Sequence, residues 1–243
     1  MKLELVPIEH LPEIRPGMNL GECLRETLRA SGQELQAGDI LAVTQKVVSK
    51  AEGRLVQLST VAPSSNSIRI GHRMNKDARL IEVILRESRR IVRMRGEVLI
   101  CETPHGFICA NAGVDQSNVE QDDTVVLLPK DPDRSARQLA TFLGCGVIIT
   151  DTFGRAWREG LVDAAIGVAR VPVFIDFRGL QDSYGHPLRV TLLASVDALA
   201  AAAGLVMGKT SRTPAALIRG FRWEKTESNM ADLLRAPERD LFL

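Results

Sequence analysis

Two short segments of this chain each end an apolar run with a carboxylate beside small hydroxyl or amide side chains. They read Asn-Ala-Gly-Val-Asp-Gln-Ser-Asn at 111–118 and Ile-Thr-Asp-Thr-Phe-Gly-Arg at 149–155. A hard divalent cation that also holds a nucleotide takes one or two protein carboxylates and leaves its other positions to water and phosphate oxygens. If the two turns meet in space, Asp115 and Asp151 would supply those carboxylates.

Each segment also has a plainer interpretation, and both interpretations stay open. Asp115 lies between Gly113 and Asn118, a composition that is typical of an Asx turn without any metal. Asp151 is followed by a hydroxyl side chain and two arginines, which together suit a metal and a phosphate. The same residues equally suit a structural turn with surface cations.

A Gly-Lys-Thr triplet at 208–210 invites comparison with a phosphate-binding P-loop. The first glycine of that motif would have to stand at position 203, where this chain has alanine. The triplet also follows an expected helix and precedes an expected strand, the reverse of the order that lets backbone amides cradle a phosphate. We therefore disfavour a true P-loop, while a looser polar loop that touches a nucleotide remains open.

Other catalytic patterns find little support. The arginines at 86–95 could receive an acidic substrate, but a charge-rich helix face is usually just solvated. The four histidines are scattered and have no metal-ligand spacing, which disfavours zinc. The chain has no Gly-x-Ser-x-Gly motif and no cysteine in a nucleophilic context, so nothing favours a covalent acyl-enzyme.

Composition limits the class of protein further. The 243 residues are 45% hydrophobic and 25% charged, which is typical of a soluble globular enzyme. Lys and Arg total 31 against 30 for Asp and Glu, so we expect no nucleic-acid partner. The four cysteines lack a C-x-x-C pair, which predicts reduced thiols and favours the cytoplasm. The longest apolar run, at 198–207, is shorter than the roughly 18 residues of a membrane span, so we expect no membrane partner.

Short β-branched runs alternate with amphipathic stretches, which predicts an α/β fold with mixed sheets of the α+β kind. We expect Lys50 to close a strand or open a turn, and a hairpin to lead into the Asp115 segment. Asp151 is expected at the carboxyl end of a buried strand, where open α/β sheets bind ligands. The expected helices cover 20–30, 77–94, 134–143 and 198–206, the expected strands cover 40–43, 98–101, 107–110, 125–128, 146–150, 190–196 and 214–219, and 228–243 should form a short helix and a tail.

Four motifs stand in a particular order and spacing along the chain. They are Ser-Lys-Ala-Glu-Gly-Arg at 49–54, the two carboxylate segments, and Val-Met-Gly at 206–208 with Ile-Arg-Gly at 218–220. Together, from Leu3 to at least Arg219, they resemble the coenzyme F420-0:L-glutamate ligases, or F420 γ-glutamyl ligases. The resemblance is to the stand-alone form, because no flavin-type carboxyl-terminal domain is present.

The resemblance implies a fold and an assembly. The fold is an α/β ligase rather than a Rossmann domain, and two chains form an intertwined homodimer. Residues 1–243 would make one ligase unit. Two subdomains would cover 1–95 with 190–243, and 96–189.

The resemblance also implies a reaction. It is that of a GTP-dependent amide ligase that joins the amine of L-glutamate to the terminal carboxylate of F420-0, and that can add a further glutamate through a γ-linkage. The cofactor expected beside GTP is Mg²⁺ or Mn²⁺. A carboxylate is a poor electrophile, so we expect transfer of the γ-phosphoryl group to give an acyl phosphate before the amine attacks. Such an enzyme needs no protein nucleophile, and it mainly positions reactants and neutralises charge.

Individual residues of this sequence match the family's functional positions. Asp115, Asp151 and Thr152 match divalent-metal positions. Lys50 and Arg155 are expected to neutralise charge on phosphoryl oxygens. The nucleotide contacts expected are Leu11, Pro12, Glu13 and Ile14 in an amino-terminal turn, Gln45 and Lys46 where the family has small hydroxyl residues, Lys50, Asn118, and the loop of Met207, Gly208, Lys209, Thr210, Ser211, Arg212 and Thr213.

One departure leaves alternatives open. Relatives carry a glutamate in the loop after Met207 that helps hold a second metal, whereas this chain has Lys209. Lys209 could touch phosphate directly, Glu159 or another carboxylate could take the metal position, or the site could hold one metal only. The chain could also be an amide ligase for another carboxylate, or a noncatalytic nucleotide-binding protein.

Overall fold

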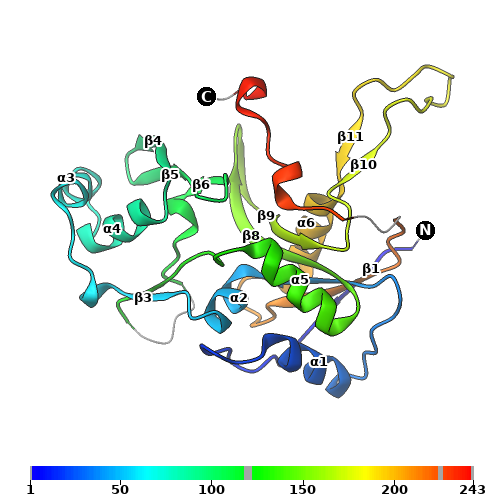
Figure 1. Cartoon of the computed structure of the whole chain (residues 1–243), viewed down its shortest axis with the longest axis horizontal. Coiled ribbons are helices and arrows are strands. Elements are labelled where there is room, and N and C mark those ends of the chain that lie inside the picture. The colour runs from blue at the N-terminus through cyan, green and yellow to red at the C-terminus, as the bar shows by residue number, and fades with distance from the viewer. Residues whose placement is uncertain (1, 118–121, 224–226, 242–243) are drawn as a thin grey trace.

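A five-stranded mixed sheet forms the centre of the computed structural model, which describes residues 2–117, 122–223 and 227–241 (Figure 1). The strands, in their order across the sheet, are β1 (Glu4–Pro7), β12 (Ala215–Arg219), β2 (Ile40–Thr44), β8 (Gly146–Arg155) and β9 (Arg158–Ala169). β2 and β8 are parallel, and the other neighbouring strands of this sheet pair antiparallel. The expected mixed α/β class is confirmed.

The parallel pair brings two distant parts of the chain together. Thr44 at the end of β2 pairs with Thr150 of β8. The helix α2 (Gln45–Ala51) begins directly after β2, so its first turn lies beside the Asp151 segment. The first four residues of β2 are fully buried, as expected for a central strand covered on both faces.

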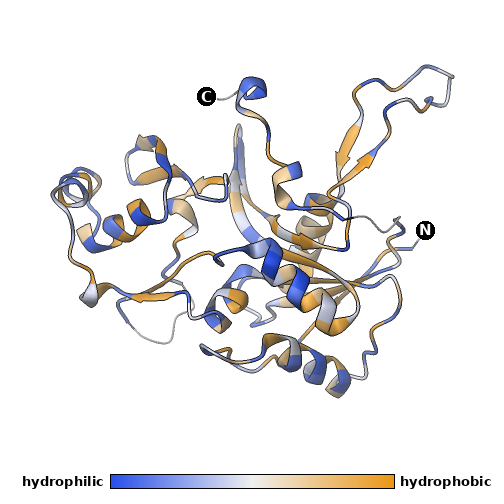
Figure 2. Cartoon of the chain, viewed as in Figure 1, coloured by the Kyte–Doolittle hydropathy of each residue, from blue (hydrophilic) through white to orange (hydrophobic). Residues whose placement is uncertain are grey.

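Three helices pack around the central sheet: α1 (Leu20–Ala30), α5 (Pro132–Leu143) and α6 (Ser195–Met207). Both α5 and α6 contact β9, and α1 contacts α5. The side chain of Asp131 caps the start of α5, and Gly144 ends this helix in a left-handed conformation. Figure 2 shows the apolar character of the strands that these helices cover.

A smaller group of elements, at the left in Figure 1, has its own apolar core. It contains β3 (Leu55–Gln57), α3 (Ser65–Met74), α4 (Ala78–Arg86), β4 (Arg90–Arg95), β5 (Val98–Glu102), β6 (Ile108–Ala110) and β7 (Thr124–Val126). The buried residues of this core run from Leu58 to Leu127. The subdomain division expected from the sequence, 1–95 with 190–243 and 96–189, stays a proposal. The two separate cores favour boundaries near residues 55 and 127.

Two hairpins extend from the body. β8 and β9 form a long hairpin whose tip carries Trp157, which is 88% exposed. β10 (Phe174–Asp176) and β11 (Leu192–Ala194) pair at the base of an arm, seen at the upper right of Figure 1. These two paired strands are apolar in Figure 2, and farther along the arm Tyr184 and Val190 are each 86% exposed.

The helix expected at 77–94 is wrong in its second half. α4 ends at Arg86, and β4 follows from Arg90. The apolar periodicity continues past the helix end, but Ile91 and Val92 are β-branched, and the segment pairs with β5, where Ile91 lies opposite Cys101. Because the helix ends at Arg86, the arginines at 86–95 form no single basic helix face. Several of them also form ion pairs with Glu82 or Glu102.

Three further expectations about elements need correction. Lys50 does not close a strand or open a turn, because it lies in the last turn of α2. The strand expected at 190–196 is shorter, since Ser195 already begins α6. Asp151 does not end its strand, because β8 continues to Arg155 to pair with β9. The helices expected at 20–30 and 134–143 and the hairpin of 98–101 with 107–110 agree with the structure.

Candidate active site

A cavity of about 970 Å³ opens at the end of β2, beside the middle of β8. The segments that line it come from six places along the sequence: an amino-terminal turn, α2, the Asp115 turn, β8, β9 and the loop after α6. The predicted site residues that line it are Leu11, Pro12, Glu13, Ile14, Gln45, Lys46, Lys50, Asp115, Asp151, Thr152, Met207, Gly208, Lys209, Thr210, Arg212 and Thr213. The structure thus brings most of the predicted set into one place, while the role of each residue stays a prediction.

Three predicted residues do not line this cavity or cannot be placed. Asn118 lies outside the described residues. Arg155 lies near the tip of the β8–β9 hairpin, where its Nη2 donates to the carbonyl of Glu159 at 2.7 Å. The hydroxyl of Ser211 donates to the carbonyl of Met207, so it closes the loop on itself.

Helix α2 supplies two ammonium groups to the cavity. Lys46 and Lys50 are four residues apart, which places them on one face of the helix. Lys46 Nζ lies 2.9 Å from the carboxylate of Asp115 and donates to Ser117 Oγ at 2.7 Å. Lys50 Nζ lies 2.5 Å from Glu13 Oε1 on the amino-terminal turn. Each lysine therefore joins α2 to another wall of the cavity.

The carboxylate of Asp115 is aimed by an unusual turn. The three residues at 111–113 all have left-handed backbone, with φ of 53°, 54° and 72°, which is costly for the two that are not glycine. A Cβ on Gly113 would come within 2.6 Å of Leu128, so only glycine fits there. Asp115 then exchanges two backbone hydrogen bonds with Val126, at 3.0 and 2.8 Å. This turn holds Asp115 in one orientation.

Opposing effects set the charge of Asp115. Burial raises the pKa of its carboxyl group, but the hydrogen bonds from Lys46 and Ser117 outweigh burial and hold the pKa below its ordinary value. The Ser117 backbone N–H donates to Asp115 Oδ1 at 2.7 Å. Asp115 is therefore a charged ligand candidate at neutral pH.

Asp151 is in a different electrostatic state. Burial raises the pKa of its carboxyl group to about 7, and repulsion from Asp115 and Asp163 acts in the same direction. The backbone N–H of Thr152 and the charge of Lys46 lower it, but by less. A cation bound at this point would stabilise the ionised form of a buried carboxylate that has like-charged neighbours. Asp115 and Asp151 line the same cavity, so the two carboxylate segments do converge.

The third carboxylate, Asp163, was missed by the sequence analysis. It lies on β9 opposite Thr152, whose hydroxyl donates to Asp163 Oδ1 at 2.5 Å. The sequence analysis assigned no strand to 158–169, so nothing placed this aspartate near the cavity. The available signal was a hairpin pattern, since an apolar run at 161–169 follows the Asp151 segment after a short turn.

The donor set fits one oxygen-ligated divalent ion. Asp115 and Asp151 supply carboxylate oxygens and Thr152 a hydroxyl, with room in the cavity for water and phosphate oxygens. The buried hydroxyl of Thr150, which also lines the cavity, has no hydrogen-bond partner among the described residues. The described residues contain no group of three or more His, Cys, Asp or Glu side chains that could hold a metal by themselves. Any such ion would need ligands from its substrate.

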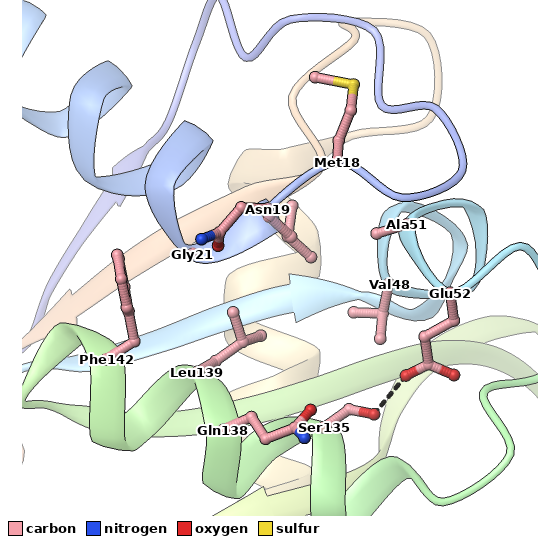
Figure 3. A pocket seen from close by; sticks show the side chains of 11 residues that line it. Met18, Asn19, Gly21, Val48, Ala51, Glu52, Ser135, Gln138, Leu139 and Phe142 are labelled. Atoms are coloured by element: carbon pink, nitrogen blue, oxygen red, sulfur yellow. Dashed lines mark hydrogen bonds between the residues drawn. The ribbon is translucent and has the colours of Figure 1, made fainter.

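A second cavity of about 320 Å³ lies on the other side of α2, between α1 and α5 (Figure 3). None of the predicted site residues that the structure describes lines it. There the hydroxyl of Ser135 on α5 donates to the carboxylate of Glu52, just past the end of α2. This bond ties α2 to α5 and thereby helps to fix the helix that carries Lys46 and Lys50.

Comparisons with known proteins agree over the whole chain. The sequence profile described as F420-0:Gamma-glutamyl ligase matches residues 9–220. The coenzyme F420:L-glutamate ligase of Methanopyrus kandleri is 45% identical over 254 residues, covering 100% of this chain and 97% of that protein. The proteins of the same name from Methanothermobacter thermautotrophicus and Methanocaldococcus jannaschii are 40% and 35% identical, and each alignment covers at least 97% of both chains.

These matches show that the chain is an enzyme of the ligase class. It belongs to the F420-0:γ-glutamyl ligase family. Among the described helices, none is both long and apolar enough to cross a membrane.

The packing of Asp163 gives a first testable expectation. A Cβ on Gly204 of α6 would lie 2.1 Å from Asp163 Oδ2. A glycine-to-alanine change inside a helix normally stabilises by about 1 kcal/mol, but here the overlap should reverse the sign. We expect Gly204→Ala to lower the free energy of unfolding by about 1–3 kcal/mol, measured by chemical denaturation. Leu205→Ala, at a position 84% exposed on the same helix, should leave it nearly unchanged. A stabilised Gly204→Ala protein would contradict this packing.

Proposed function

We propose that this enzyme uses GTP and a divalent metal ion to join L-glutamate to coenzyme F420-0 through an amide bond, and that it can extend the product by a γ-linked glutamate. One observation carries the proposal. In a chain related over its full length to proteins named coenzyme F420:L-glutamate ligase, a single cavity joins Asp115 and Asp151 to three lysines. Carboxylates that hold a cation, beside ammonium groups that hold phosphates, are what a nucleotide-driven ligase requires.

The reaction proceeds in two substitutions. An oxygen of the F420-0 terminal carboxylate attacks the γ-phosphorus of GTP, the bond from that phosphorus to the bridging oxygen breaks, and GDP leaves with the electron pair. The amine of L-glutamate then attacks the acyl carbon of the resulting acyl phosphate. The carbon–oxygen bond to phosphate breaks, inorganic phosphate leaves, and the amine gives up a proton to solvent. Neither step forms a bond to the protein.

The residues of the cavity divide the remaining work. Asp115, Asp151 and the hydroxyl of Thr152 would hold the divalent ion, which when bound supplies positive charge to phosphate oxygens. Lys46 and Lys50 bind and orient the triphosphate as point charges from α2. Two further segments contact the nucleotide from two sides of the cavity. They are the amino-terminal turn of Leu11, Pro12, Glu13 and Ile14 and the loop of Met207–Thr213. Arg155 would reach phosphate or substrate only if the β8–β9 hairpin moves.

The pairing of charges supports this assignment. Lys46 pairs with Asp115, Lys50 with Glu13, and the third lysine with Asp163. Each of these three lysines is therefore paired in the absence of a nucleotide, and a metal-bound triphosphate would enter by taking Lys46 and Lys50 from their present partners. Such exchange costs less than burying unpaired charges.

We also propose a homodimer that works in the cytoplasm. Exposed apolar side chains on the two hairpins support the dimer, namely Leu161, Leu180, Tyr184 and Val190, which are 55–86% exposed. The four cysteines are free, as a reducing compartment favours. Light scattering of the purified protein should give twice the chain mass of 26.6 kDa. A single-chain mass at micromolar concentration would reject the dimer.

The test of the function is direct. The protein is incubated with F420-0, L-glutamate, GTP and Mg²⁺ or Mn²⁺, and the product is measured by mass spectrometry, with ATP in place of GTP as a second arm. We expect a product heavier by one glutamate residue and one phosphate released for each amide bond. Nucleotide binding without phosphate release would indicate a noncatalytic protein. Phosphate release only with a different carboxylate would indicate another acceptor.

A further inference from the structure

Lys209 lines the same cavity as Lys46 and Lys50. It belongs to the loop that follows α6, and its Nζ lies 2.7 Å from both Thr152 Oγ1 and Asp163 Oδ1. The side chain of Asp163 is only 5% exposed, whereas that of Lys209 is 60% exposed. A flexible lysine thus reaches from solvent to a buried carboxylate and a hydroxyl at the same time.

The carboxylate that Lys209 meets is fixed in place. Asp163 accepts a hydrogen bond from Thr152 across the β8–β9 pair, and its other oxygen packs against Gly204 of α6. It cannot turn toward solvent without breaking this packing. A buried carboxylate in such a position is costly unless a positive charge stands beside it. Lys209 supplies that charge from the protein itself.

The distribution of cations over the three carboxylates is uneven. Asp115 pairs with Lys46, and Asp163 pairs with Lys209. Asp151 lines the same cavity and has no ion pair with any described residue. The carboxylate of Asp151 is therefore left for an exchangeable cation. The oxygen pair of Thr152 Oγ1 and Asp163 Oδ1 already accepts hydrogen bonds from the ammonium group of Lys209.

A second divalent ion at that oxygen pair would have to displace Lys209. A metal ion and an ammonium group cannot share the same lone pairs, and two cations in contact repel each other. Glu159 offers no alternative ligand, because it does not line the cavity, and its carbonyl accepts from Arg155 at the hairpin tip.

We propose that the ammonium group of Lys209 is a built-in cation that occupies the Thr152–Asp163 position, so that the cavity takes one divalent ion with the nucleotide rather than two. This inference rests on the proposed metal- and nucleotide-dependent function. In this arrangement the hydroxyl of Thr152 accepts a hydrogen bond from Lys209 instead of ligating the metal ion, so the single ion is held at Asp115 and Asp151. Lys209 remains as a positive charge near the phosphates.

Counting bound Mn²⁺ tests the proposal. The purified protein is titrated with Mn²⁺ in the presence of a nonhydrolysable GTP analogue, and free Mn²⁺ is measured by electron paramagnetic resonance. We expect one Mn²⁺ per chain in the wild type. In Lys209→Met the oxygen pair of Thr152 and Asp163 becomes available, and we expect two. Thermal unfolding of each variant establishes that it is folded.

Two matched variants separate position from charge. Lys209→Arg keeps a cation at the same place and should bind one Mn²⁺. Lys130→Met removes one positive charge from an exposed position outside the cavity but leaves Lys209 in place, so it should also bind one. A Lys130→Met protein that binds two ions would show that net charge alone controls the count, which would overturn the proposal.

The wild-type count tests the inference even if a variant does not fold. Two Mn²⁺ ions in the wild type, or one in a folded Lys209→Met protein, would overturn the role of Lys209 while leaving metal-dependent ligation intact. No bound Mn²⁺ in the wild type would overturn the proposed metal site as well, and so would reject both together.

Discussion

Asp151→Asn is expected to lower the turnover of F420-0 with GTP and metal by about 10²–10³-fold, the typical loss when a charge-stabilising group is removed from an active site. The asparagine has the same shape but no negative charge, so it binds a divalent ion weakly. Turnover at saturating substrate is the measurement. A variant that keeps wild-type turnover would exclude Asp151 from the reaction.

The stability of the same variant distinguishes a lost charge from a damaged fold. Burial raises the pKa of Asp151 to about 7, so above the pKa of the unfolded chain the ionised form opposes folding of the metal-free protein. This loss of stability is fully present above pH 7, and it disappears as the pH falls toward the pKa that the aspartate has in the unfolded chain. At pH 8 Asp151→Asn should therefore unfold at no lower a temperature than the wild type. Asp123→Asn, outside the cavity, should retain full turnover.

Lys50→Ala is expected to weaken GTP binding by about 10–100-fold, because a hydrogen bond to a charged group contributes about 1.5–3 kcal/mol. Its Nζ lies in the cavity on the face of α2 that also carries Lys46, and its present partner Glu13 is replaceable by phosphate. Calorimetric titration with a nonhydrolysable GTP analogue measures the affinity.

The fold should survive this change. The side chain of Glu13 is 59% exposed, so losing its partner leaves it solvated rather than buried and unpaired. Lys130→Ala removes the same charge from an exposed position outside the cavity and should bind GTP like the wild type. Unchanged affinity in Lys50→Ala would remove this lysine from the nucleotide site.

Local patterns predicted several elements well. The helix at 20–30 follows from its apolar stripe and its Asn19 cap, and α5 follows from Asp131 and Gly144 at its ends. The predictions failed where local and tertiary preferences differ. The stretch at 90–95 has apolar residues at helical spacing, yet pairing with β5 makes it a strand. The long strand β9 was missed, because its role depends on a partner strand, β8, that completes the sheet.

The sequence by itself determined the family, the mixed α/β class and the two carboxylate segments, because motif order and local periodicity are properties of the chain alone. It did not determine which charges meet. Lys46 and Asp115 are 69 positions apart along the chain, and Lys209 and Asp163 are 46 apart.

Only the tertiary structure decided these pairs, through the parallel register of β2 with β8 and the pairing of β8 with β9. Ion pairs depend on distances of a few ångströms between side chains, and such distances are set by strand register and helix packing rather than by spacing in the sequence. For the same reason a hairpin pattern at 161–169 could indicate a strand there, but it could not show that Asp163 meets Lys209.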